Sequence, residues 1–457
     1  MRPFSSSPSS PAPSSGVPHR SGAEPSGPLR DADFRRLWAG QTASQLGEHT
    51  TLVVLPLFAV LTLDAGAGQL GALRAVGQAP ILLLSLLAGA WVDRWRARTV
   101  MVLTDAGRAV ALGAAAVAGL LGLLGLPALF VVAFTVGALS VLFDVAYQAS
   151  LVRMVRRDQL VWGNSVLEGS RSAAQIGGPA LGGTLVSLLS APVAVATGAL
   201  FFAASFGSLR RIRGPEAVPG RAAPAAERAS PVRRRIGEGL RFVAKNASLR
   251  AVCLASAAFQ LSFAATMTVY LLFVPHELRL TGVTVGLALA ATGPGALLGS
   301  VLAARLPGRF GHGAVLVSAA VLGNGALLCV PALQGSSIAT VLALLAVNFV
   351  FGTFSQLVNV TVMSVRQAVT PDGMQGRAAA TITFVGMGFT PLGSLLGGLL
   401  AQEWGPRTGL LVSAAGMMLS PVLMAVSPLA RLGRVLPVPG GRAAPPAGSG
   451  RGRTAAG

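Results

Sequence analysis

One acidic residue stands inside a long apolar segment, where a charge is costly. Glu48 lies eleven residues beyond Leu37, the first residue of that segment. At a helical rise of about 1.5 Å per residue, this spacing would place Glu48 near the centre of a membrane. A charge there costs about 2.5–3.5 kcal/mol even on a lenient insertion scale, and desolvation favours the protonated form of a carboxyl. We expect Glu48 to couple protons or to recognise a cation, with a buried hydrogen-bonding role as the alternative.

A charged loop follows the second apolar segment. It contains Gly89, then the acid Asp93, then three alternating arginines, Arg94, Arg96 and Arg98. An acid at a helix end beside arginines can form charge-assisted hydrogen bonds that hold two parts of a protein together. The glycine, one turn before the acid, lets a neighbouring helix approach. These residues are expected to form a charged latch, although any cytoplasmic loop of a membrane protein is basic.

The fifth apolar segment is rich in glycine. It contains Gly178, Pro179, Gly182 and Gly183 within one and a half helical turns. Small residues allow close helix packing in a membrane, and a proline inside a helix bends it. We expect a bent, tightly packed helix here, and ordinary close packing would also explain this composition.

Aromatic and amide side chains recur in three apolar segments. Such side chains suit a cavity for an amphipathic organic molecule, because rings supply contact area and amides supply hydrogen bonds. The candidates are Gln45, Phe259, Phe263, Tyr270, Gln356 and Asn359. A phenylalanine in an apolar segment is more commonly packed in the core or turned toward lipid, which is the alternative interpretation.

Other reactive residue types lack the spacing for chemistry. The four histidines are scattered, and Cys253 and Cys329 both stand in apolar segments, so no metal site or disulfide is predicted. Lys245 follows no phosphate-binding glycine loop, which argues against an ATP-driven pump. Asp105 and Arg108, at i and i+3, are expected to form a local ion pair at the membrane interface. We expect neither an enzyme nor a bound cofactor.

These residues need a membrane to position them. Of the 457 residues, 52% are hydrophobic and only 11% are charged, whereas about a quarter of the residues of a soluble domain are charged. A spanning helix needs about 20 mostly apolar residues, which predicts an all-α membrane protein. Twelve segments meet this requirement, at residues 37–63, 70–92, 100–124, 128–151, 164–189, 193–209, 249–274, 283–304, 314–333, 338–365, 377–401 and 408–426.

The twelve expected spans divide into two groups of six. A stretch rich in proline and arginine separates the groups, and stretches rich in Ser, Pro or Gly form both ends of the chain; such compositions predict disorder. The predicted parts are an N-terminal tail at 1–33, a six-helix half at 34–209, a cytoplasmic linker at 210–248, a second six-helix half at 249–430 and a C-terminal tail at 431–457.

The two groups also share landmarks. Arg366 follows Arg153, and Pro391 follows Pro179, at almost the same separation along the sequence. Two landmarks at nearly one separation indicate a duplicated six-helix unit. Parallel repeats with a substrate site at their interface are a known plan for transporters.

The basic residues indicate how the chain is oriented. The 36 Lys and Arg outnumber the 16 Asp and Glu and give a net charge of +20, which in a soluble protein would suggest a nucleic-acid partner. Here they follow the even-numbered spans or lie in the tails, and only Arg74, Arg279 and Arg407 are expected near the other side. Because cytoplasmic loops carry the excess of Lys and Arg, we expect both termini in the cytoplasm and no nucleic-acid partner.

The latch loop at residues 89–98 resembles the signature loop of the major facilitator superfamily, with Ala97 at one usually basic position. The resemblance implies a fold of two six-helix halves and a cytoplasmic gate formed by this loop. In the superfamily an acid late in span 4 often pairs with an arginine of that loop, which implies that Asp144 belongs to the gate. The Gly-Pro-x-x-Gly-Gly core at residues 178–183 is similar to the motif of the superfamily's antiporters, which export their substrates.

Further similarity is to bacterial drug and secretion exporters, including macrolide and siderophore efflux proteins. It rests on Phe34-Arg35-Arg36-Leu37-Trp38 before span 1 and on Arg366-Gln367-Ala368-Val369-Thr370-Pro371-Asp372 before span 11. The resemblance implies a proton-coupled secondary transporter of the bacterial inner membrane. Such a protein would export a small organic molecule, such as a drug, antibiotic or secondary metabolite, by alternating access.

Two other functions are weighed against export. Uptake or facilitated transport of a small solute would use the same architecture. A non-transporting membrane sensor would need a folded soluble domain, and the tails and linker predict none. The expected partners are therefore a small-molecule substrate, protons and the lipid bilayer, and the protein is expected to be a monomer.

Overall fold

The computed structural model describes residues 32–92, 95–154, 160–213, 232–371 and 374–434, and all regular structure in them is helical. The first half contains α1 (Ala32–Thr62), α2 (Ala67–Val92), α3 (Ala97–Leu120), α4 (Leu126–Met154), α5 (Leu160–Leu188) and α6 (Ala191–Arg210). The second half contains α9 (Ala247–His276), α10 (Gly282–Ala290), α11 (Thr292–Phe310), α12 (His312–Leu327), α13 (Ile338–Val369), α14 (Gln375–Gly388), α15 (Thr390–Gly416) and α16 (Leu419–Ala425). The predicted all-α class is confirmed.

Two predicted spans are interrupted rather than continuous. α10 and α11 follow one another through Ala291, and α14 and α15 through Phe389, so each of these breaks falls inside one expected span. α15 passes through Gly405, whose φ of 80° is easily reached only by a residue without a Cβ. The helix therefore contains the end of one expected crossing and, after Gly405, the start of the last one.

The described residues contain nine helical segments that are long and apolar enough to cross a membrane. One of them, Thr381–Ala425, has 45 residues and includes the turn at Gly405, so it has the length of two crossings. α2 and α5, with 26 and 29 residues, are also long enough to span. The helices are therefore consistent with the twelve predicted spans.

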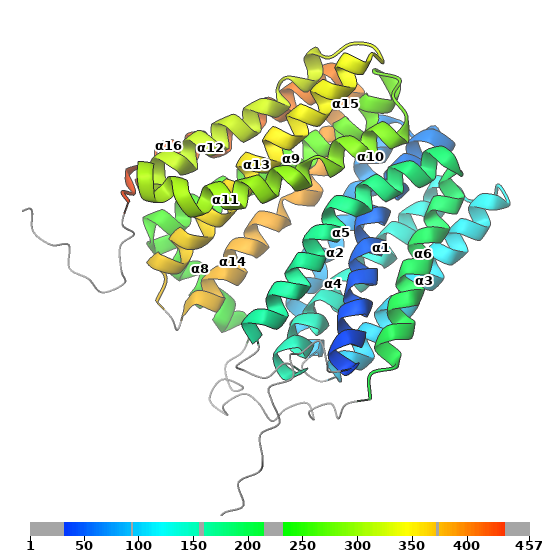
Figure 1. Ribbon diagram of the computed structural model, residues 1–457, viewed down its shortest axis with the longest axis horizontal. Helices are drawn as coiled ribbons and strands as arrows, with labels where there is room; N and C mark the ends of the chain where they lie inside the picture. The colour runs from blue at the N-terminus through cyan, green and yellow to red at the C-terminus, as the bar shows by residue number, and fades with distance from the viewer. Residues whose placement is uncertain (1–31, 93–94, 155–159, 214–231, 372–373, 435–457) are drawn as a thin grey trace, which may run out of the picture.

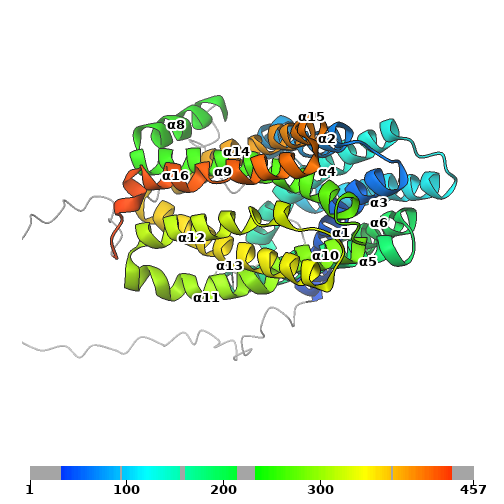
Figure 2. The same ribbon diagram turned by 90° about the horizontal axis from the view of Figure 1, so that it is seen from above.

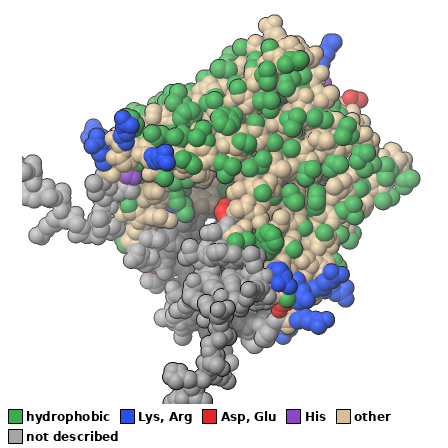
Figure 3. All heavy atoms as spheres, in the orientation of Figure 1, with side chains coloured by type: hydrophobic (Ala, Val, Ile, Leu, Met, Phe, Trp, Pro, Cys, Tyr) green, Lys and Arg blue, Asp and Glu red, His purple; other side chains and the backbone are tan. Residues whose placement is uncertain are grey.

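Each half has its own apolar core. Phe58, Phe202 and Leu112 lie in the core of the first half, and Tyr270 and Phe273 in the core of the second; all five are 1% exposed or less. Many other leucines and valines are exposed, and Figure 3 shows hydrophobic side chains over much of the surface, with Lys and Arg gathered toward the ends. An apolar outer surface of this extent suits a lipid surround.

One part of the predicted linker is folded, which corrects the expectation of disorder there. Residues Val232–Lys245 form helix α8, which packs against α9 and α14. Val243 is buried in a cluster with Leu249 and Val252, and Asn246 caps the next helix by accepting hydrogen bonds from two backbone amides. The basic composition of this segment suggested disorder, but the segment forms an amphipathic helix whose apolar side chains pack against α9 and α14. Residues 214–231, and most of both tails, lie outside the described residues.

The halves lie side by side (Figure 2), and two pairs of helices make most of the contacts between them. α5 packs against α10, and α2 packs against α15. From these contacts the halves diverge toward the ends where α1 begins and where η5 (Pro428–Arg431) ends, as Figure 1 shows. We call the side with these chain ends the terminal face and the other side the opposite face.

Candidate transport site

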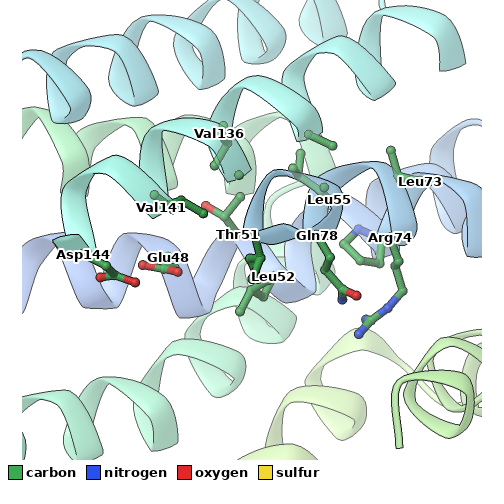
Figure 4. A pocket seen from close by; sticks show the side chains of 16 residues that line it. Glu48, Thr51, Leu52, Leu55, Leu73, Arg74, Gln78, Val136, Val141 and Asp144 are labelled. Atoms are coloured by element: carbon green, nitrogen blue, oxygen red, sulfur yellow. The ribbon is translucent and has the colours of Figure 1, made fainter. Parts of the chain in front are cut away.

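A cavity of about 170 Å³ lies in the first half, between α1, α2 and α4 (Figure 4). Its walls are mostly apolar, with Leu52, Leu55 and Val136 among them. A water molecule occupies about 30 Å³ of liquid, and pockets for drug-sized ligands hold about 300–1,000 Å³. The cavity therefore accommodates several waters or a part of a larger organic molecule.

The charged groups of the cavity lie at its two ends. Glu48 of α1 and Asp144 of α4 lie close together at one end, and Arg74 of α2 lies at the other, beyond Gln78 (Figure 4). Glu48 keeps 25% of its side chain exposed, so it is accessible from the cavity. The predicted proton-coupling acid therefore has a second carboxyl as its neighbour.

Behind Glu48 lies a buried arginine. The guanidinium of Arg108 is ion-paired with Asp105, and its Nη1 lies 3.8 Å from the Oε2 of Glu48. It also donates hydrogen bonds to Ser44 at 2.9 Å and Ser140 at 3.1 Å. Arg108 is fully buried, and burying a charge is tolerated only when partners compensate it. These residues come from α1, α3 and α4, so the ion pair also ties helices together.

Aromatic rings and one further hydroxyl complete this cluster. The guanidinium carbon of Arg108 lies 4.5 Å from the ring centre of Phe143 and 4.3 Å from that of Phe202, within cation–π range. Ser205 of α6 donates a hydrogen bond to Asp105. The predicted pairing of Asp105 with Arg108 is confirmed, and both side chains are 0% exposed, so the pair lies inside the helix bundle. Its place at the membrane interface stays a prediction.

The predicted gate lies partly outside the described residues. Asp93 and Arg94 belong to that part, while Gly89 lies in the last turns of α2. Arg96 precedes α3 and is exposed. Arg98 donates a hydrogen bond to the carbonyl oxygen of Arg210 at 2.8 Å and so links the start of α3 to the end of α6. Asp144 lines the cavity, and the gate stays a prediction.

The glycines of α5 have two different partners. A Cβ on Gly178 would lie 2.5 Å from an atom of α1, and one on Gly182 would lie 3.1 Å from that helix. Gly183 faces the second half, where its Cβ would lie 2.1 Å from the carbonyl oxygen of Gly282 on α10. The Pro179 carbonyl oxygen abuts α10 as well. The predicted close packing is present, and it joins the halves as well as helices within one half.

The second half repeats these contacts. Each contact glycine has a counterpart at one constant separation along the sequence: Gly178 and Gly393, Gly182 and Gly397, Gly183 and Gly398, and on the partner helices Gly71 and Gly286. The first two glycines of α15 press on α9, and the third meets α2, with its Cβ 2.8 Å from the Cα of Gly71. The predicted duplication is visible in these contacts, but Pro391 is not the counterpart of Pro179, because the constant separation pairs Pro179 with Ser394.

None of the six residues predicted to line a substrate cavity lines this one. Gln45 is buried in the first half, and Tyr270 is 0% exposed, with its hydroxyl accepting a hydrogen bond from Asn348 at 3.1 Å. Gln356 donates to Ser300 at 3.3 Å, and Asn359 is exposed.

Two of the six belong to an aromatic stack in the second half. The ring centres of Phe259 and Phe263 are 5.3 Å apart, and those of Phe263 and Phe351 are 5.4 Å apart. The separation that relates the contact glycines also makes Phe263 the counterpart of Glu48. One half therefore carries an acid where the other carries a ring.

Two residues of the site were not predicted to belong to it. Arg74 lies seven residues into α2, near the end of the span where it was expected, and it also lines the cavity. Arg108 was expected only as the partner of Asp105 in an ion pair at the membrane interface. The sequence does indicate a site role for Arg74 and Arg108. An arginine inside an apolar span is costly and usually faces the interior of a helix bundle or a cavity.

The sequence is similar to a family of membrane transporters and to individual bacterial proteins. The family model of transmembrane secretion effectors matches residues 23–438. The multidrug efflux pump Tap of Mycolicibacterium fortuitum is 27% identical over 423 residues, covering 89% of this chain and 97% of that protein. The uncharacterized MFS-type transporter YfiS of Bacillus subtilis is 25% identical over 396 residues, covering 82% and 88%.

Solved structures share the fold. A bacterial homologue of the iron transporter ferroportin in an inward-facing state has a TM-score of 0.69 and 19% identity, covering 87% of this chain and 98% of that one. The nucleoside transporter NupG has a TM-score of 0.65 and 13% identity, covering 86% and 98%. The chain therefore belongs to the transmembrane secretion effector family of the major facilitator superfamily, and it is a membrane transporter of small molecules rather than an enzyme.

Proposed function

We propose that this transporter exports a small organic molecule in exchange for protons, with Glu48 as the proton-carrying group. One observation carries the proposal: Glu48 opens onto the cavity on one side and lies 3.8 Å from the buried Arg108 on the other. The similarity to the multidrug efflux pump Tap supports export of drug-like molecules.

The Arg108 cluster supplies the physical basis of coupling. When Glu48 is ionised, Arg108 and any cationic group in the cavity compete for its charge. When Glu48 is protonated, Arg108 keeps Asp105 as its partner, and the cavity loses a negative charge. Protonation therefore weakens the binding of a cationic substrate, which links proton entry to substrate release. Each proton that crosses contributes about 2.3 kcal/mol per 100 mV of membrane potential.

Alternating access would use the two helix contacts between the halves, α5 with α10 and α2 with α15, which we call the joints. The glycine contacts hold α5 to α10 and α2 to α15, while the halves diverge at the terminal face, which supports an inward-facing state. We assign the terminal face to the cytoplasm of a bacterial inner membrane, because basic residues gather there. The gate at Gly89, Asp93, Arg94, Arg96, Arg98 and Asp144 would close this side, and a monomer suffices for the cycle.

The Glu48→Gln variant tests the proposal. A drug-susceptibility panel of cells with and without the protein first identifies an exported compound. Efflux of that compound is then measured with the proton gradient intact and after collapse by an uncoupler. We expect Glu48→Gln to lose gradient-driven efflux by at least about tenfold, since loss of one charge-assisted interaction at a site is worth about that much.

The same substitution at a glutamate outside the cavity serves as the control. Glu403→Gln removes an exposed carboxyl on α15, outside the cavity, and should export as the unchanged protein does. Equal amounts of both variants in the membrane are verified by immunoblotting. Gradient-driven efflux at the unchanged rate in Glu48→Gln would refute the role of Glu48, and greater drug accumulation in cells that contain the protein would indicate uptake.

A further inference from the structure

Arg74 is a cavity residue without a charged partner. It stands one turn beyond Gly71, where α2 meets α15, and therefore lies at the end of the cavity nearest the joint between the halves. Its Nε is buried and makes no hydrogen bond, and among the described residues no carboxylate lies within ion-pair distance of its guanidinium.

An arginine in this position needs an acceptor. Arg74 is half-buried with its Nε fully covered, and an arginine inside an apolar span is costly unless it has a partner. Arginine presents a planar fork of donors that fits a carboxylate or phosphate in two-point fashion. The Arg108 guanidinium in the same half shows the usual solution, with Asp105 and two serines around it. Arg74 has a cavity in place of such partners, so its acceptor is expected to be a group that enters and leaves.

The opposite end of the same cavity carries negative charge. Glu48 and Asp144 lie there, and leucine, isoleucine and valine side chains line the walls in between (Figure 4). Along α1 the cavity extends from Glu48 to Pro56, which at about 1.5 Å per residue is about 12 Å of helix. A ligand that reaches both ends has a cationic group and an anionic group about 10 Å apart. Since the cavity of about 170 Å³ holds only part of a drug-sized molecule, the rest of such a ligand lies outside this cavity.

We propose that Arg74 binds the anionic group of the transported molecule and that the substrate class is a zwitterionic amphiphile. The cationic group of the substrate lies against Glu48 and Asp144, and its carboxylate or phosphate-like group lies against Arg74. The inference rests on the proposed export function but adds a substrate class and a residue that selects it.

A matched pair of probes tests this assignment. Norfloxacin carries a carboxylate and a protonated piperazine at opposite ends of a rigid ring system. Its ethyl ester keeps the rings and the piperazine, loses the carboxylate charge and gains an ethyl group. Binding of both to the purified full-length chain in lipid nanodiscs is measured by isothermal titration calorimetry. The unchanged protein should bind the acid about tenfold or more tightly than the ester, as expected for a charged hydrogen-bonded pair.

Substitution of the arginine should remove this preference. Arg74→Gln should weaken binding of the acid by about tenfold to hundredfold and change binding of the ester by less than about twofold. Arg74→Lys, which keeps the charge without the planar fork, should retain part of the preference. Arg279→Gln, an exposed arginine at the opposite face, is the matched control and should retain all of it.

Several outcomes would overturn the assignment. They are equal affinity of the unchanged protein for the acid and the ester, binding of neither probe, and unchanged acid binding in Arg74→Gln. Should Arg74→Gln misfold, as judged by gel filtration, Arg74→Lys and the ester comparison still decide the question. Gradient-driven, Glu48-dependent efflux of the ester would leave export intact while removing the zwitterionic class, so the two proposals fail separately.

Discussion

At the scale of single residues, the buried charges of the described residues, Asp105 and Arg108, both lie in the first half. Arg108 is surrounded by an acid, two serines and two aromatic rings, and Glu48 connects this group to the cavity. The equivalent position of Glu48 in the second half carries Phe263, part of a ring stack. Equivalent positions of the two halves therefore differ in chemistry, with a carboxylate in the first half and an aromatic ring in the second.

The buried ion pair leads to a prediction about stability. Arg108→Gln leaves Asp105 buried beside serines only, and removal of one partner of a buried pair costs about 3–5 kcal/mol. Thermal unfolding of the detergent-solubilised variant should therefore occur at a clearly lower temperature than that of the unchanged protein. The double variant Asp105→Asn with Arg108→Gln should recover part of the loss, because it leaves no unpaired charge. Equal melting of Arg108→Gln and the unchanged protein would contradict this account.

At the scale of helices, the closest contacts of α5 and α15 with their neighbours are made at glycines. α5 uses Gly178 and Gly182 for α1 and Gly183 for α10, so one helix holds its own half together and meets the other half at the same height. α15 does the same with α9 and α2. Small residues on two faces of one helix permit backbone contact with two neighbours.

Filling one of these contacts should disturb the joint. A Cβ on Gly183 would lie 2.1 Å from the Gly282 carbonyl oxygen, so Gly183→Ala forces α5 and α10 apart. Overpacking of this kind costs about 1–3 kcal/mol, which should appear as a lower melting temperature and slower efflux. Gly177→Ala on the same helix is the control, because a Cβ there meets no atom within 4 Å. A Gly183→Ala variant as stable and active as Gly177→Ala would argue against the contact.

The sequence predicted the positions of the helices better than it predicted which side chains and helices contact one another. The predicted span at 193–209 agrees closely with α6, and the one at 338–365 with α13, because an apolar run long enough to span is itself the signal. The placement of Arg108 against Glu48 was not predictable in the same way, since helical spacing tells which residues share a face and not which helix that face meets. Helix α8 was missed because its apolar side chains are few and its partners, α9 and α14, are not visible from its own spacing.

At the scale of the whole molecule, the halves are joined by two symmetry-related helix pairs, α5 with α10 and α2 with α15. Ser187 of α5 accepts a hydrogen bond from the amide of Val283 on α10 at 2.9 Å, and Ser394 of α15 donates one to Gln78 on α2 at 3.1 Å. Both hydrogen bonds cross between the halves. Any state open at the opposite face must break or lengthen them.

A covalent link across this joint should therefore stop the cycle. Ser187→Cys combined with Val283→Cys, in a chain whose Cys253 and Cys329 are replaced by serine, places two thiols on facing elements. Oxidation should abolish efflux while leaving binding from the terminal face intact, and reduction should restore efflux. Each single cysteine variant serves as the control. Full efflux with the disulfide formed would show that the joint does not need to open.

The backbone nature of the joints has a consequence for how such a protein diversifies. The contacts at Gly71, Gly183, Gly286 and Gly398 are made by main-chain atoms, so they do not depend on which side chains line the cavity. Cavity positions such as Leu52 and Val136 can therefore change without altering the contacts between the halves. A lineage could therefore change its substrate by a few cavity substitutions while the contacts between its halves are inherited unchanged.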